Sequence, residues 1–212
     1  MKTIMSLMAA GSFLLFQAMP VWAASTTFTV SATVPAASGI NMTVSSVNSS
    51  SGAFTTEPAG TTALSFDPMT FNTTNNIYVP NHYFAVDVSV SGGSGSPDTT
   101  VTYSEGANPN GGGSSNGLGV KSTATFAKET PNGSGGTTET LLTAHGPKKR
   151  MIDLNGEHVA FTEVSGGFLR MYLGVWTGTT VAPADPSNGQ PFSNADVAGQ
   201  YTGSLLVTAV VN

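Results

Sequence analysis

The chain has 212 residues, no cysteine and only 9% charged residues, whereas about a quarter is usual for a soluble domain. Twelve acidic and seven basic residues give a net charge of −5. The chain also has no stripe of lysine or arginine, so a basic nucleic-acid-binding protein is excluded. Without cysteine, disulfides and thiolate zinc sites are excluded. Twenty-five glycines, twelve prolines and abundant Thr and Ser are typical of a β-protein with many turns.

Residues 1–23 have the three-part order of a secretory signal peptide. Lys2 precedes an apolar run over residues 4–16, and the small residues Val21 and Ala23 fit a cleavage site after residue 23. Because the run is shorter than the roughly 20 residues of a membrane span, we expect cleavage and no span in the mature chain. An uncleaved anchor is the alternative. The expected location is the cell surface or the medium, reached through the periplasm.

The mature chain begins with a strand pattern over residues 27–34. Apolar and polar residues alternate there at every second position, as in a strand buried on one face. The apolar positions are Phe28, Val30, Ala32 and Val34. Pro35 follows, and it ends the pattern because proline has no N–H for a ladder hydrogen bond.

Alternation recurs over residues 40–44, 84–91, 168–176 and 205–211, and stretches rich in Gly, Ser, Asn and Pro separate these segments. No window of ten or more residues has a convincing helical period. Many short strands with turn signals predict an all-β, immunoglobulin-like antiparallel β-sandwich that occupies residues 24–212 as one domain with Gly-rich loops. A sandwich that carries an inserted hairpin is the alternative.

Candidate catalytic and metal sites are weak. His82, His145 and His158 do not have metal-ligand spacing, and no Gly-x-Ser-x-Gly elbow or phosphate-binding loop is present. We therefore expect no enzyme activity and no cofactor. The loop 185–189, with Asp196 nearby, has oxygen ligands for calcium but also ordinary turn chemistry, and the turn is favoured. The basic cluster 148–150 is expected in a solvated loop that leads into a strand over residues 151–154.

One segment suggests a ligand-binding face. Phe168, Tyr172 and Trp176 fall on the same face of the predicted strand 168–176. Such aromatic side chains either stack on sugars at an exposed surface or fill a core, and packing in a core is the commoner case. The exposed reading gives an alternative function: a self-contained secreted module that binds carbohydrate or another surface ligand.

The clearest alternation lies at the two ends of the chain. The last strand has the apolar positions Leu205, Val207, Ala209 and Val211. A terminal strand of this kind either closes its own sheet or adds to the exposed sheet edge of a neighbour. Lending a strand head to tail is a heterologous contact, and it builds a fibre instead of a closed dimer.

These ends resemble known proteins. The sequence Phe-Thr-Val-Ser-Ala-Thr-Val at residues 28–34 looks like the start of chaperone–usher pilins and of spore-coat-U-like domains. The segment 198–208 resembles their closing strand, with Gly199-x-Tyr201 followed by alternating apolar residues. The chain departs from many such subunits in its greater length and its lack of a disulfide, and residues 45–195 match no family.

The resemblance implies an incomplete immunoglobulin-like sandwich in a structural subunit of a surface fibre or coat, such as a fimbrium. Its partners would be copies of itself in a head-to-tail polymer, a periplasmic chaperone and an outer-membrane usher. The resemblance implies a donor role for Phe28, Val30, Ala32 and Val34. The groove or chaperone contact would then involve Tyr201, Leu205, Val207, Ala209 and Val211.

Overall fold

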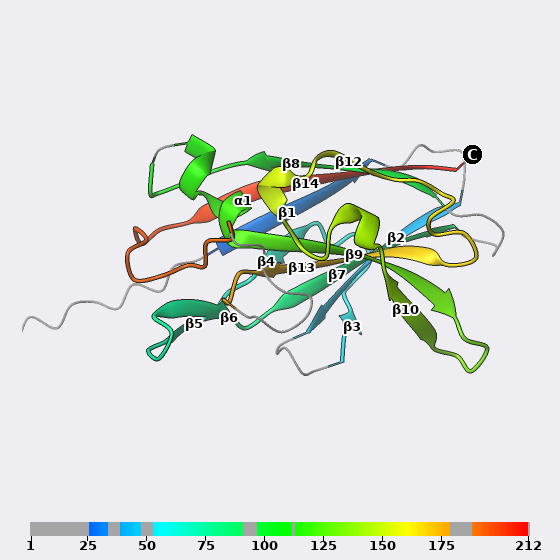
Figure 1. The fold of residues 1–212 in the computed structure, drawn as a ribbon, viewed down its shortest axis with the longest axis horizontal. Helices are drawn as coiled ribbons and strands as arrows, with labels where there is room; N and C mark the ends of the chain where they lie inside the picture. Colours follow the sequence, from blue (N-terminus) through cyan, green and yellow to red (C-terminus); the bar gives the residue numbers. More distant parts are fainter. Residues whose placement is uncertain are drawn as a thin grey trace, which may run out of the picture.

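The computed structural model describes residues 26–33, 39–47, 53–90, 97–111, 113–178 and 188–211. Two sheets form the layers of a sandwich (Figure 1). Sheet A has the strand order β12 (Asn155–Val159), β8 (Asp98–Glu105), β14 (Tyr201–Val210), β1 (Thr26–Thr33) and β4 (Ala63–Ser65). Sheet B has the order β10 (Thr137–Leu141), β9 (Ser122–Pro131), β13 (Phe168–Val175), β7 (Tyr83–Val90), β2 (Ile40–Val47) and β3 (Thr55–Thr56).

Smaller elements complete the fold. Strand β11 (Lys149–Arg150) also pairs with β9, and β5 (Met69–Asn72) and β6 (Ile77–Pro80) form a separate hairpin. Among the described residues the one α-helix is the single turn α1 (Leu118–Lys121), with 3₁₀ turns at Gly113–Asn116, Thr143–His145 and Met151–Asp153. The prediction of an all-β antiparallel sandwich is confirmed. The pairing of β1 with β14 is parallel, in contrast to the other strand pairs of the two sheets.

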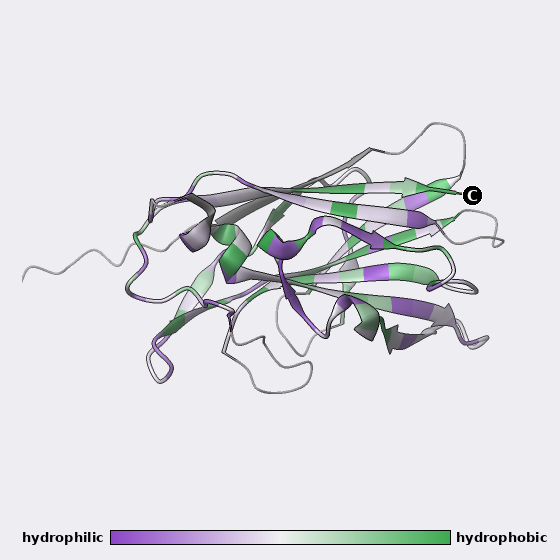
Figure 2. Ribbon diagram, turned by 45° about the horizontal axis from the view of Figure 1, so that its top comes forward, coloured by the Kyte–Doolittle hydropathy of each residue, from purple (hydrophilic) through white to green (hydrophobic). Residues whose placement is uncertain are grey.

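Alternating sequence produces the buried faces. In β14 the residues Tyr201, Leu205, Val207 and Ala209 are all 0% exposed, whereas Leu206 between them is 41% exposed. The same period of two recurs over the first six residues of β13, and Figure 2 shows alternating hydrophobic and hydrophilic bands along the long strands. Apolar side chains of both sheets meet in one core between the layers. Each large side chain buried there contributes about 1.5–3 kcal/mol.

The predicted strand over residues 151–154 is wrong. These residues form a 3₁₀ turn, in which Met151 and Leu154 are both fully buried. Side chains three positions apart lie on the same side of a 3₁₀ turn, whereas a strand would point them to opposite faces. The turn therefore lets both apolar side chains enter the core.

Two predictions fall on residues that are not described. The signal peptide 1–23 and the donor position Val34 lie outside the described residues. Within the described ranges, no helix has the length and apolar character that a membrane crossing requires.

The two adjacent leucines of β14 provide a test of the packing. Leu205→Ala is expected to lower the free energy of unfolding by about 2–5 kcal/mol, because it leaves a cavity in the core. Leu206→Ala, on the outer face of the same strand, should change it by no more than about 0.5 kcal/mol. Urea unfolding at equilibrium measures both, and equal effects would contradict the register of β14.

Candidate functional site

The N-terminal strand β1 lies inside sheet A, between the C-terminal strand β14 and β4. It pairs in parallel with β14 over eight positions, from Thr26 opposite Tyr201 to Thr33 opposite Thr208. On its other side it pairs antiparallel with β4 over three positions. Figure 1 shows β1 and β14 side by side in one layer. The two ends of the described chain are therefore neighbours in one sheet.

The register brings together the donor and groove positions that the sequence singled out. Phe28, Val30 and Ala32 stand opposite Gly203, Leu205 and Val207 of β14, respectively. All three β14 residues are buried. Val211 follows the end of β14 and is half-buried. Without β1, eight residues of β14 would form an unpaired sheet edge next to the core. Such an edge is a template for another strand.

Glycine at position 203 is a feature of this strand that sequence reasoning missed. A Cβ atom there would collide with the hydroxyl end of Tyr103, whose ring occupies the space beside the glycine. A glycine inside an alternating strand commonly marks such a close approach, and that signal was present in the sequence. Tyr103 is 7% exposed and its hydroxyl group donates to Glu105 at 3.2 Å, so the ring is held in place.

A buried ion pair supports the start of β14. Lys121 Nζ lies 2.6 Å from Asp196 Oδ1, and the side chains are 5% and 14% exposed. Asn110 donates to the same oxygen at 2.8 Å, and the backbone N–H of Ser193 donates to Oδ2 at 2.7 Å. Asp196, considered above beside a calcium loop, is thus held by protein donors. The loop residues 185–187 lie outside the described residues.

Tyr201 begins β14 just beyond this pair. Its hydroxyl group donates to the carbonyl of Val197 at 2.7 Å, and its ring packs edge-on against Phe192 with 4.9 Å between centroids. Burial, together with the negative charge of Asp196, raises the pKa of Tyr201 to about 12. The phenol therefore stays neutral, and its hydrogen bond to Val197 holds the first residue of β14 in place.

The predicted aromatic face is only partly present. Phe168 and Tyr172 lie half-buried on β13, on either side of Arg170, whose guanidinium carbon is 5.7 and 6.0 Å from the two ring centroids. Trp176 does not belong to this face, because β13 ends at Val175 and the indole is only 1% exposed.

Close packing explains the burial of Trp176. A Cβ atom built on Gly189 would lie 2.8 Å from the indole ring, so the loop after residue 188 covers it closely. The alternative that placed Trp176 on an exposed ligand face is therefore wrong, and the favoured case, packing in a core, holds for this residue.

A network of charges crosses the outer face of sheet B. Arg170 donates two hydrogen bonds of 2.7 Å to Asp87 on β7 and one of 2.9 Å to Glu129 on β9. The hydroxyl group of Tyr172 donates to Glu139 on β10 and lies 3.3 Å from Glu129. Hydrogen bonding to Asp87 raises the pKa of Arg170, and burial raises that of Tyr172. This network was not predicted from the sequence, because its members lie far apart along the chain.

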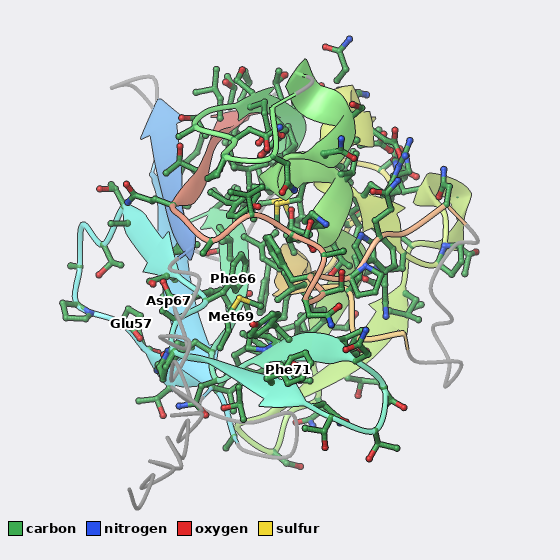
Figure 3. The ribbon with its side chains drawn as sticks, turned by 90° about the vertical axis from the view of Figure 1, so that its left-hand side faces the viewer. Glu57, Phe66, Asp67, Met69 and Phe71 are labelled. Atoms are coloured by element: carbon green, nitrogen blue, oxygen red, sulfur yellow. The ribbon has the colours of Figure 1, made fainter. Side chains whose placement is uncertain are left out.

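A polar groove with a volume of about 710 Å³ lies beside β4, between the edges of the two sheets. Its carboxylates are Glu57 and Asp67, which Figure 3 shows at one side of the sandwich, with Phe66 and Met69 closer to the middle. The hydroxyl group of Ser46 donates to Glu57, and that of Ser65 donates to Asp67 at 3.3 Å. Both acidic groups therefore have donors within the chain.

A second charge cluster connects the two sheets at the opposite edge. His145, buried in its 3₁₀ turn, has Nδ1 2.6 Å from Glu157 Oε1 and Nε2 3.0 Å from Glu163 Oε1. Lys149 of β11 lies 2.6 Å from the other oxygen of Glu157, which is in β12. Burial alone would raise the pKa of Glu157, but hydrogen bonds and positive charge from Lys149 and His145 outweigh it and lower that pKa. The sequence left His145 as a surface or packing histidine, and the structure buries it. The solvated loop expected for the basic cluster 148–150 is corrected, because Lys149 and Arg150 form β11 and are half-buried.

Comparison of the chain with protein-family models, with curated proteins and with solved structures gives no match.

The Glu157 cluster predicts acid sensitivity. The ionised carboxylate stabilises the fold above its unfolded pKa of about 4.3, and this contribution is lost as the pH falls through the lower folded-state pKa. Glu157→Gln should lower the free energy of unfolding by about 1.5–3 kcal/mol at pH 7, and the difference from the unaltered chain should shrink below pH 4. Urea unfolding between pH 3 and pH 7 measures this.

Asp153→Asn is the control, since Asp153 pairs with Arg150 at the surface and is 42% exposed. Its effect at pH 7 should stay within about 1 kcal/mol. A Glu157→Gln difference that stays constant across the whole pH range would contradict the assignment.

Proposed function

We propose that this chain is an exported structural subunit of a surface fibre or coat, and that it assembles by strand addition through its N-terminal strand. One observation carries the proposal: β1 occupies a gap in sheet A between β14 and β4, and eight of its residues pair with the last strand of the chain. A gap of this kind accepts any strand with the same alternation, including β1 of a second copy.

The connection of β1 to the rest of the chain supports such an exchange. Residues 34–39 separate β1 in sheet A from β2 in sheet B, so β1 forms no hairpin with the strand that follows it in the chain. The β1 strand of a neighbour has the same sequence and can form the same backbone pairs. Exchange of an identical element between copies is a low-cost route to assembly, and head-to-tail exchange leaves one gap and one strand open at the ends of the polymer.

The same gap in sheet A explains why the chain would need assembly partners. An empty gap would expose the edge of β14 and the buried side chains of Leu205 and Val207, which is an aggregation hazard. A periplasmic chaperone would cover this edge before assembly, and an outer-membrane usher would be the place of exchange. Both are the partners that the resemblance of the chain ends implies.

Removal of the strand tests the proposal. A chain that lacks residues 24–35 is expected to stay unpolymerised and to bind a synthetic peptide of that sequence, which restores the missing pairs with β14. Size-exclusion chromatography and electron microscopy of the full and the shortened chain measure assembly, and fluorescence anisotropy of the labelled peptide measures binding. Assembly that persists without residues 24–35 would refute strand lending, and so would a shortened chain that the peptide cannot rescue.

Two peptide variants make the test specific to the register. Val30→Asp puts a charge at an apolar position of the alternation, opposite buried Leu205, at a cost of about 3 kcal/mol or more, so affinity should fall by more than about a hundredfold. Ser31→Asp stands opposite exposed Leu206 and should bind within about threefold of the unaltered peptide. Equal losses for the two peptides would contradict the pairing.

A further inference from the structure

A groove on the outer face of sheet B brings aromatic, aliphatic and polar side chains together. Figure 1 shows β3 and β10, the two edge strands of sheet B, projecting on the side away from sheet A. Between these projections lies a groove with a volume of about 580 Å³, within the usual range of about 300–1,000 Å³ for small-molecule sites. Its floor comes from β13, β7 and β9, and its walls include Phe54 and Glu139.

The apolar part of the groove combines aromatic rings with aliphatic side chains, namely Val47, Val79, Leu141, Leu173 and Val175. Phe54 is 38% exposed, and its ring centroid lies 5.7 Å from that of Tyr172 at a tilt of 48°. Tyr83 lies close over Gly174, where a Cβ atom would come within 3.1 Å of its ring. The glycine therefore lets this tyrosine ring lie low on the sheet, and the floor stays open above it.

The polar part of the groove is held rigidly. Tyr172 is fixed from both sides, because its hydroxyl group donates to Glu139 and its ring lies beside Arg170, which is bound to Asp87 and Glu129. The exposed carboxylate of Glu139 has further acceptor sites that can take hydrogen bonds from a ligand. A site whose side chains are locked by their neighbours loses little conformational entropy when a ligand binds.

The chemistry of the lining selects one class of occupant. We propose that this groove binds a neutral glycan, with a sugar ring stacked on Phe54 and Tyr172 and with sugar hydroxyl groups donating to Glu139. A pyranose has an apolar C–H face for the rings and hydroxyl groups for the polar lining. The groove contains one carboxylate, Glu139, and one ammonium group, Lys148, so it has no net charge that would attract an anionic ligand.

An apolar occupant fits less well. A lipid tail or a hydrophobic peptide segment would remove the carboxylate of Glu139 from water without offering it hydrogen-bond donors, which is costly. The proposal goes beyond assembly, because neither β1 nor β14 contributes to the groove.

The experiment uses the full mature chain on an array of neutral oligosaccharides of the glucose, galactose, mannose and N-acetylglucosamine series, with sialylated and sulfated counterparts. We expect retention on at least one neutral series. Phe54→Ala and Glu139→Gln should each weaken that retention at least tenfold, while the melting temperature stays within a few degrees of the unaltered chain. Isothermal titration with the best neutral oligosaccharide on the array measures the loss.

Phe161→Ala is the matched control, because Phe161 is equally exposed at 43% but does not line the groove. It should leave retention unchanged. The proposal is overturned by absence of retention on every neutral series, by retention confined to the acidic glycans, or by equal losses for Phe54→Ala and Phe161→Ala. None of these outcomes bears on strand lending, since the peptide of residues 24–35 and the sheet edge of β14 are tested separately.

Discussion

The parallel pairing of the first described strand with the last one is the constraint on which sheet A depends. Without β1, the strand order of that sheet has a break between β14 and β4, and β4 loses its one strand partner among the described residues of the sheet. Eight consecutive pairs hold β1 to β14, so a single strand closes one layer of the sandwich. Because a β-strand is held by a row of backbone bonds to its neighbours, an equivalent strand from another molecule can replace it.

A cysteine-free chain needs other links between distant segments, and here charged side chains provide them. Lys121 and Asp196 tie the turn before β9 to the loop before β14, while Arg170 bridges β13 to β7 and β9. Pairs of this kind are sensitive to the loss of one partner, since the remaining charge is then buried without compensation. Although the chain has few ionisable groups, several of them form ion pairs that join distant segments. Charge therefore contributes more to the fold than the low charged fraction indicates.

The sequence predicted those features that depend on local alternation. A period of two over residues 205–211 was enough to identify the buried face of β14, and the same pattern over residues 27–34 located β1. The alternative face that joined Trp176 to Phe168 and Tyr172 was wrong because the pattern does not reveal where a strand ends, and β13 ends one residue before Trp176. The partners of Arg170 could not be predicted, since Asp87 and Glu129 come from strands that only the folded topology makes adjacent.

The proposed assembly site and the proposed glycan-binding groove lie on different sheets of the sandwich. The gap that β1 fills belongs to sheet A, whereas the groove at Phe54 and Tyr172 lies on the outer face of sheet B. A strand exchanged between copies would replace β1 without touching the strands that form the groove. Each copy in a polymer would then still present its groove, and repetition along a fibre would convert a weak single contact with a glycan surface into strong multivalent attachment.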